Sequence, residues 1–283
     1  MNVKIYGTPG EFLTENQAFL QQFEAVCQLN LGNAAAYRDE PCRPDLLFGC
    51  CKEDGRSVLL FGNTLPYNLC LNAIPGDPAA LSAAVLLAEY LRREEIKITG
   101  VNASKTLCNA FFSAYGKPYR VRAAMDIMVL KELCEPPVVS ATVRKAELSE
   151  LGIVTDWACA FTKEALREES VPEEMRERFQ SIIQDGRLYL METKEKAPVS
   201  MAAVVGRSLP HGVGINWVYT PPEYRGKGYC QNTVAAICRE KLGERFDYCT
   251  LFVDKANPIS NRVYEKIGFQ VMEDNFDCRL EEA

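Results

Sequence analysis

The sequence contains a single histidine, His211, and this scarcity excludes several kinds of catalytic site. A Ser-His-Asp or Cys-His nucleophile would have to use His211, and its surroundings, "SLPHGVG", do not resemble a nucleophile elbow. Metal sites built on a pair of histidines are excluded as well, so we expect no bound metal. We interpret His211 as an exposed turn residue between two strands.

The sequence also lacks any C-x-x-C pair, although it has 12 cysteines, of which Cys50 and Cys51 are adjacent. These spacings fit neither a disulfide framework nor a zinc site. Free cysteine is among the residue types most often buried, and cytoplasmic thiols stay reduced. We therefore expect reduced cysteines that fill the core.

Long apolar runs and basic runs are absent too. The longest apolar stretch, "AALSAAVLLAEYL", reaches a glutamate well short of the about 18 to 20 residues that span a bilayer. The first residues, "MNVKIYGTPGEFLTENQ", do not have the charged start and apolar core of a signal peptide. A net charge of -6 disfavours nucleic acids and anionic membranes as partners. We expect a cytoplasmic protein that binds neither, and no feature indicates a homo-oligomer.

The 283 residues, 47% hydrophobic and 25% charged, fit a globular α/β protein of one large or two ordinary domains. The Pro136-Pro137 step between two apolar runs is the best boundary, which gives domains 1–135 and 138–283. In the second domain, the hydrophobic pattern and the turn residues predict strands and helices in the order β-α-α-β-β-β-α-β-α-β. Its expected elements are strands 141–146, 188–193, 199–206, 212–220, 248–254 and 269–280, and helices 147–166, 171–186, 230–242 and 257–268.

The first half repeats the end of this order. Strands are expected at 56–63, 67–74, 96–102 and 119–133, and helices at 77–95 and 104–117. A shift of 152 residues aligns Gly116 with Gly268 and Phe112 with Tyr264. Because the identity is low, the repeat is a hypothesis that rests on element order. It predicts two mixed α/β domains, each a mostly antiparallel twisted sheet flanked by helices.

The stretch "YTPPEYRGKGYCQNT" (219–233) joins a strand to a helix through two glycines. A helix N-terminus exposes unpaired N–H groups and the positive end of the helix dipole, and glycines let an anion approach them. Two phosphate loops are poor fits: Pro221 stands at the first glycine of a Walker A loop, and Gln231 at the third glycine of a dinucleotide fingerprint. The alternative is a tight turn without a ligand.

Arg225, Gly228 and Cys230 resemble the R/Q-x-x-G-x-G/A motif of the GNAT superfamily of acyl-CoA-dependent N-acyltransferases. The later "DKANPISNRVYEKIGF" is similar to the second signature of that family, an asparagine followed by a helix with a tyrosine and then Gly-Phe. The element order of the second domain matches the whole GNAT fold. The resemblance covers about half the chain, and it departs from the motif at Cys230, where the family has Gly or Ala.

The resemblance implies a role for each matched residue. Backbone N–H groups of the loop would hold the pyrophosphate of acetyl-CoA, with Arg225 supporting the loop, and the strand end would pair with the pantetheine on an edge that its neighbour has left open. Asn257 would contact the cofactor near the thioester, and Tyr264 would be the general acid. The implied cofactor-binding residues are Val218, Tyr219, Thr220, Arg225, Gly226, Lys227, Gly228, Tyr229, Cys230 and Asn257.

The sequence does not identify the general base that would deprotonate the amine. A lysine-like amine loses its proton at pH 7 at a cost of about 4 to 5 kcal/mol, and strand 212–220 contains no carboxylate that would accept it. We interpret Glu223 as a solvated turn residue. Glu164, Glu168 and Glu169 either line an acceptor pocket or lie on a solvated face.

The first half departs further from the family pattern. Where a pyrophosphate loop would stand, "NAIPGDPAALS" offers one glycine and no arginine, and Phe112 has no hydroxyl to match Tyr264. By resemblance, residues 1–135 form a degenerate GNAT-like domain without a CoA loop. The chain is then expected to transfer an acetyl group from acetyl-CoA to a primary amine of a small molecule or a protein. A CoA-binding sensor or scaffold without turnover, and a structural protein whose "RGKG" is only a turn, are the alternatives.

Overall fold

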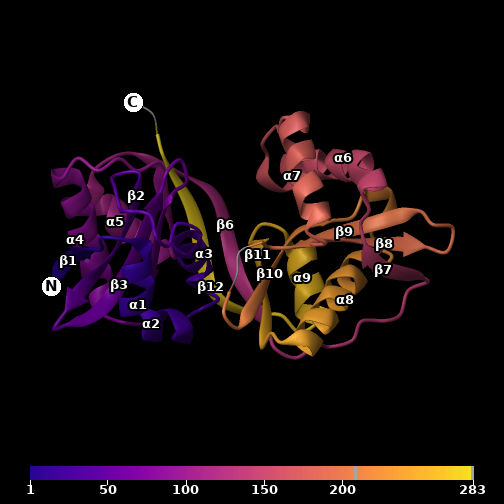
Figure 1. The fold of residues 1–283 in the computed structure, drawn as a ribbon, viewed down its shortest axis with the longest axis horizontal. Helices are drawn as coiled ribbons and strands as arrows, with labels where there is room; N and C mark the ends of the chain where they lie inside the picture. The colour runs from indigo at the N-terminus through magenta and orange to yellow at the C-terminus, as the bar shows by residue number, and fades with distance from the viewer. Residues whose placement is uncertain (207–208, 282–283) are drawn as a thin grey trace. The chain divides into compact units, whose positions relative to one another are not determined.

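The computed structural model describes residues 1–206 and 209–281, which form two compact units. Unit 1 consists of Met1–Ile127 and the final segment from Val271, and unit 2 consists of Met128–Gln270. The ranges expected from the sequence, 1–135 and 138–283, assign that final segment to the second domain instead. Within unit 2 and within unit 1, the mixed α/β architecture expected from the sequence is confirmed (Figure 1).

Unit 1 is a sheet with helices on both faces. Its strands follow the order β1-β2-β3-β4-β5-β12-β6, and from β1 to β12 the neighbouring strands are antiparallel except β4 and β5, which are parallel. The elements are β1 (Asn2–Ile5), α1 (Pro9–Glu15), α2 (Gln17–Gln22), α3 (Gln28–Ala36), β2 (Leu46–Glu53), β3 (Arg56–Thr64), β4 (Leu69–Ala73), α4 (Ala79–Arg93), β5 (Gly100–Ala103), α5 (Lys105–Tyr115), β6 (Tyr119–Leu130) and β12 (Gln270–Leu280).

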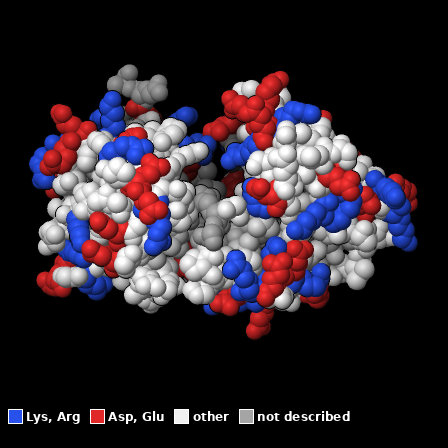
Figure 2. Space-filling view, viewed as in Figure 1, with Lys and Arg blue, Asp and Glu red and all other residues white. Residues whose placement is uncertain are grey.

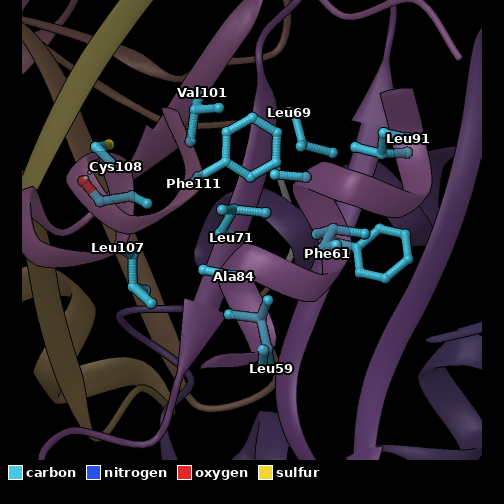
Figure 3. Packing of buried hydrophobic residues seen from close by; sticks show 14 of the residues in the cluster. Leu59, Phe61, Leu69, Leu71, Ala84, Leu91, Val101, Leu107, Cys108 and Phe111 are labelled. Carbon is cyan, nitrogen blue, oxygen red and sulfur yellow. Dashed lines mark hydrogen bonds between the residues drawn. The ribbon is translucent and has the colours of Figure 1, made fainter. Parts of the chain in front are cut away.

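The core of unit 1 lies between the sheet and helices α4 and α5. Buried positions of α4 recur at helical spacing, so one face of the helix meets the sheet. Figure 3 shows Phe111 of α5 and Leu91 of α4 beside Leu69 and Leu71 of β4. On the other face of β2, Phe48 contacts Phe12 of α1, with ring centroids 5.2 Å apart. The sheet of unit 1 is thus covered on both sides.

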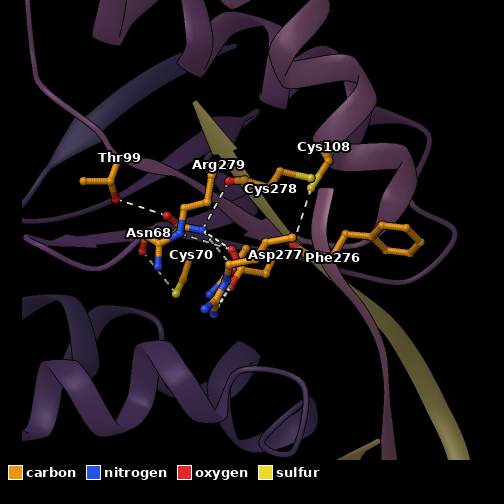
Figure 4. Close-up of polar contacts among 10 residues, drawn as sticks. Asn68, Cys70, Thr99, Cys108, Phe276, Asp277, Cys278 and Arg279 are labelled. Atoms are coloured by element: carbon orange, nitrogen blue, oxygen red, sulfur yellow. Dashed lines mark hydrogen bonds and ion pairs between the residues drawn. The ribbon is translucent and has the colours of Figure 1, made fainter. Parts of the chain in front are cut away.

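A buried carboxylate on β12, Asp277, forms an ion pair and hydrogen bonds within unit 1. Asp277 is 4% exposed, and the Arg122 guanidinium donates to its Oδ2 at 2.5 and 2.8 Å. Asn68 of β4 donates to the Asp277 Oδ1 at 2.7 Å and to the Cys278 carbonyl at 3.2 Å (Figure 4). Since a buried carboxylate is costly without partners, these contacts support the position of β12, which also pairs with β5.

Unit 2 has the element order expected from the sequence up to its last helix. The strands β7 to β11 lie in the order β11-β10-β9-β8-β7, with β10 and β11 parallel and the others antiparallel. The elements are β7 (Ala141–Lys145), η1 (Leu148–Glu150), α6 (Leu151–Phe161), the π-helical turn η2 (Thr162–Leu166), α7 (Pro172–Gln184), β8 (Leu188–Thr193), β9 (Pro198–Val204), β10 (Gly212–Tyr219), η3 (Pro222–Tyr224), α8 (Tyr229–Glu244), β11 (Tyr248–Asp254) and α9 (Pro258–Lys266).

Two hydrophobic clusters cover the two faces of the unit 2 sheet. Helices α8 and α9 pack on one face, with Val234, Ile237 and Tyr264 in the cluster. Helices α6 and α7 pack on the other, with Trp157 and Phe179 (Figure 1). His211 is exposed in the bend before β10, as expected. Figure 2 shows basic and acidic side chains interspersed over the face that it draws.

The two units share one succession of elements. Each has a first strand, helices, three antiparallel strands, a helix, a strand parallel to the last of the three, and a further helix. This agreement supports the predicted repeat at the level of element order. No element was expected in the first 53 residues, where the structure has β1, α1 to α3 and β2.

Candidate active site

Strands β10 and β11 lie side by side only at their beginnings. The parallel pairing runs from Gly212 with Tyr248 to Gly214 with Thr250 and ends there, although β10 continues to Tyr219. Beyond Gly214, no strand of the described chain pairs with this edge of β10. Its backbone groups are therefore available to an extended ligand.

A β-bulge lies in the same part of β10. The pairing with β9 gains one residue between Asn216 and Tyr219, and Trp217 has a positive φ of 52°. Val218 packs with the α8 and α9 cluster, whereas Trp217 and Tyr219 pack with the α6 and α7 cluster. The extra residue shifts the alternation of side chains and turns the strand end away from its neighbour.

The loop after β10 leads into α8 through two glycines with positive φ, Gly226 at 75° and Gly228 at 81°. No atom lies within 4 Å of the place where a Cβ of Gly226 would stand. Gly228 is the N-cap residue of α8, and the first turn, which begins with Tyr229 and Cys230, has no acidic side chain and no side-chain cap. The positive end of this helix is thus exposed to an incoming anion.

Arg225 ties the loop to the end of β10 and to η2. Its Nε donates to the Thr220 carbonyl at 2.8 Å, and its Nη2 donates to the Glu164 Oε2 at 2.6 Å. The Tyr219 hydroxyl donates to the other Glu164 oxygen at 3.0 Å. Burial, followed by the bond to Glu164, raises the pKa of Tyr219 to about 12. The Lys227 ammonium donates to the Glu223 carbonyl at 3.2 Å.

Tyr264 lies on α9 and is 7% exposed, with its ring edge on Phe269 at 5.9 Å between centroids. Burial, and then the Cys230 thiol, raise the pKa of Tyr264 well above its ordinary value. No described group forms a hydrogen bond with its hydroxyl. Burial also raises the pKa of Cys230 to about 12, so both groups keep their protons at neutral pH.

Asn257 and Thr220 each already have a structural contact. The Asn257 Oδ1 accepts from the Ser260 N–H at 3.1 Å and caps α9. The Thr220 hydroxyl lies 2.9 Å from the Ser200 hydroxyl. The amide nitrogen of Asn257 and the backbone N–H of Thr220 are the groups left for a ligand.

The glutamates that the sequence offers as a general base or for the acceptor pocket differ in their contacts. Glu164 contacts Arg225 and Tyr219, whereas the exposed Glu169 pairs with Lys163 at 3.0 Å. Glu223 is exposed in η3. Strand β10 does contain Asn216, whose Oδ1 is buried without a hydrogen-bond donor in the described part of the chain. No sequence signal singles out Asn216, because the position of its side chain depends on the bulge that follows it.

The segment around the predicted domain boundary lies against the loop. The Asn232 side chain donates to the Pro137 carbonyl at 3.1 Å, and a Cβ on Gly228 would stand 3.2 Å from the Val139 Cγ1. An ion pair between Glu135 and Arg239 of α8 holds the same segment. Residues 135–139 therefore help to fix the start of α8.

Among the described residues, no three His, Cys, Asp or Glu side chains are grouped closely enough to hold a metal ion. In the same part of the chain, no helix has the length and apolarity that crossing a bilayer requires. In unit 1, Phe112 stacks on Tyr119 at 4.0 Å in the core, where it offers no hydroxyl.

Comparison with known proteins gives a family for unit 2 and a fold for the whole chain. The model described as "Acetyltransferase (GNAT) family" matches residues 153–269. An acetyltransferase from the GNAT family of Colwellia psychrerythraea is 9% identical with a TM-score of 0.61, and the match covers 99% of this chain and 100% of that one. A GCN5-related N-acetyltransferase from Sphaerobacter thermophilus is 18% identical with a TM-score of 0.59, covering 98% and 94%.

A third structure, a tandem GNAT protein from the clavulanic acid biosynthesis pathway, is 13% identical with a TM-score of 0.53, and the match covers 98% of this chain and 97% of that one. At these identities the structures establish the fold alone. No curated protein matches the sequence.

Proposed function

Residues 153–269 belong to the acetyltransferase (GNAT) family, and from this premise we propose that unit 2 transfers an acetyl group from acetyl-CoA to a primary amine of a small molecule or a protein. The parting of β10 from β11 after Gly214, at the strand that leads into the glycine loop, carries this proposal. The same local fold leaves both a backbone edge and a helix N-terminus open.

The residues at this place fit acetyl-CoA. N–H groups of Gly226, Lys227, Gly228, Tyr229 and Cys230 bind the pyrophosphate, because the glycines admit it and the helix dipole favours it. Val218 to Thr220 bind the pantetheine along the open edge of β10. Acetyl-CoA supplies an activated acyl group, so the protein needs only to hold it and to direct the amine.

Tyr264 is the proposed general acid. When the neutral amine attacks the thioester carbonyl, a carbon–nitrogen bond forms, the carbon–sulfur bond breaks, and the sulfur leaves with the electron pair and takes a proton from the Tyr264 hydroxyl. The proton that the new amide nitrogen loses passes to solvent, and Tyr264 recovers a proton from solvent. The ordinary pKa values of a thiol and a tyrosine make the transfer from Tyr264 to the sulfur uphill by about 2 kcal/mol. Burial adds to that cost, and it also keeps the proton on Tyr264 over the neutral range.

Glu164 is the carboxylate that we assign to the acceptor side. It lies at η2, and Arg225 and Tyr219 hold its two oxygens. Arg225 balances its charge, so Glu164 offers a hydrogen-bond acceptor to the amine and does not select the acceptor by charge. Asn216 supplies an acceptor oxygen beside the bulge.

The alternative is a sensor that binds acetyl-CoA without turnover. The absence of a carboxylate from β10, with Glu164 already engaged by Arg225, favours this second function. Both functions predict that acetyl-CoA stabilises the protein, by RT ln(1 + [L]/Kd). Release of free CoA thiol in the presence of an amine occurs only in the enzyme.

The deciding experiment is a panel of primary amines tested for thiol release from acetyl-CoA, with the Tyr264→Phe variant alongside. We expect turnover with at least one cationic amine, and a loss of kcat of about 10²-fold or more in the variant with little change in the acetyl-CoA Kd. Unchanged turnover in Tyr264→Phe would exclude the acid role. Binding of acetyl-CoA without thiol release for any amine would favour the sensor.

A further inference from the structure

Unit 1 contains a cavity of about 300 Å³ at the place that corresponds to the cofactor site of unit 2. It lies at the ends of β4 and β5 and the beginnings of α4 and α5, and all the residues that line it belong to unit 1. The parallel pairing of β4 and β5 ends at Cys70 with Asn102, so these strands also part. The cavity therefore lies where two parallel strands part, as the open edge of β10 does.

An acyl-CoA does not fit this cavity, because the helix N-terminus beside it is already occupied by a carboxylate. The Asp77 Oδ1 accepts from the Ala79 N–H at 2.9 Å at the start of α4, and its Oδ2 pairs with Arg56 at 2.5 Å. A pyrophosphate would meet this carboxylate rather than free N–H groups.

The β12 wall of the cavity carries carboxylates without a countercharge. Glu273 and Asp274 both line it, and in the described chain neither has a lysine or arginine partner. Asp274 accepts only a backbone N–H, that of Lys105, at 3.3 Å. Burial raises the pKa of Glu273, because no positive charge offsets its desolvation.

An unpaired amide lies on the same wall. Asn275 is 5% exposed, and its Oδ1 is buried with no hydrogen-bond donor in the described chain. Since residues two apart on a strand face the same side, Glu273 and Asn275 lie on one face of β12. A buried acceptor next to an uncompensated carboxylate needs a donor that also brings positive charge.

We propose that this cavity binds a small organic cation, an amine with an apolar body. Its ammonium donates to Glu273 and to the Asn275 Oδ1, and its apolar part contacts Leu71, Ile127 and Leu107. The volume is at the low end of ligand cavities, which fits a compact ligand. Unit 1 is then a second amine site, independent of acetyl transfer in unit 2.

The test is calorimetric titration of the full chain with phenethylamine, using 2-phenylethanol and 3-phenylpropionate as neutral and anionic probes of similar shape. We expect phenethylamine to bind at least tenfold more tightly than either. Glu273→Gln, which keeps the size and removes the charge, should weaken the amine at least tenfold. Glu89→Gln, the same change on an exposed part of α4 away from the cavity, should leave it unaltered.

Leu81→Trp provides a second variant that leaves every charge in place. Leu81 lines the cavity and is 46% exposed, so a larger side chain there obstructs the cavity without disturbing the core. We expect it to weaken phenethylamine as Glu273→Gln does, while both variants keep the wild-type Kd for acetyl-CoA. Phenethylamine binding that neither variant weakens, equal binding of the three probes, or no binding at all would overturn the proposal.

Discussion

Replacing Gly228 by alanine tests the proposed pyrophosphate loop most directly. The residue has a φ of 81°, where an alanine costs about 1 to 2 kcal/mol. Its new Cβ would also stand 3.2 Å from the Val139 Cγ1, which adds a small steric cost. We expect a loss of about 2 kcal/mol in the free energy of unfolding, and acetyl-CoA binding at least tenfold weaker because the methyl group stands between the ligand and the backbone.

Gly243→Ala is the matched control, since it makes the same chemical change in the same helix. Gly243 is inside α8, no atom lies within 4 Å of its Cβ position, and its backbone suits any residue. Alanine there should stabilise the protein by about 0.5 to 1 kcal/mol. Adding Val139→Ala to Gly228→Ala removes the steric cost and leaves the cost of the positive φ.

The assay is urea unfolding followed by tryptophan fluorescence, because both tryptophans, Trp157 and Trp217, lie in unit 2. Acetyl-CoA titration of the folded variants measures binding separately. If Gly228→Ala binds acetyl-CoA as tightly as Gly243→Ala does, the loop does not bind the cofactor through its backbone, and the reasoning is refuted.

Three further predictions concern single contacts. Asn257→Ala should cost about 1 kcal/mol by loss of the α9 cap, and Asn257→Ser should restore the cap; if acetyl-CoA binding in Asn257→Ser stays at wild-type strength, the amide does not contact the cofactor. Asp277→Ala should cost about 1 to 2 kcal/mol in urea unfolding because the hydrogen bonds of the buried carboxylate to Arg122 and Asn68 are lost, and an unchanged free energy of unfolding would show that these bonds do not hold β12. The folded pKa of Tyr219 is about 12 and the unfolded value about 10, so the folded state retains the proton longer; stability should fall as pH rises from about 10 to 12, and less so in Tyr219→Phe.

Local signals in the sequence predicted most of unit 2. Strands 188–193 and 248–254 and the second helix, from Pro172 to a glycine, agree with β8, β11 and α7, because alternation and Gly or Pro punctuation act over a few residues. The glycines of the loop also have the positive φ that their place before α8 requires. The same signals were weak in residues 1–53, where helices of six to nine residues and the continuous apolar strand β2 give no clear period.

Contacts between distant residues could not be predicted from one sequence. Glu164 meets Arg225 across 61 positions, and Asn232 meets Pro137 across 95. The position of β12 is a stronger case, because its pattern of residues suits either sheet. In unit 1, β12 pairs with β5, packs Cys278 into the core and joins Asp277 to Arg122 and Asn68, and those two side-chain partners lie 155 and 209 positions away.

The parting of the parallel strands belongs to the fold and not to cofactor binding, since it occurs at Cys70 in unit 1 as well as at Gly214 in unit 2. What differs is the residue at the start of the next helix. In unit 2 the first turn of α8 has no acidic side chain, and in unit 1 Asp77 bonds the Ala79 N–H of α4. A helix N-terminus favours a negative charge in both units, and in unit 1 the chain provides that charge itself. The capacity for an anionic cofactor therefore depends on a single loop, while the space between the strands is free to take a ligand of the opposite charge.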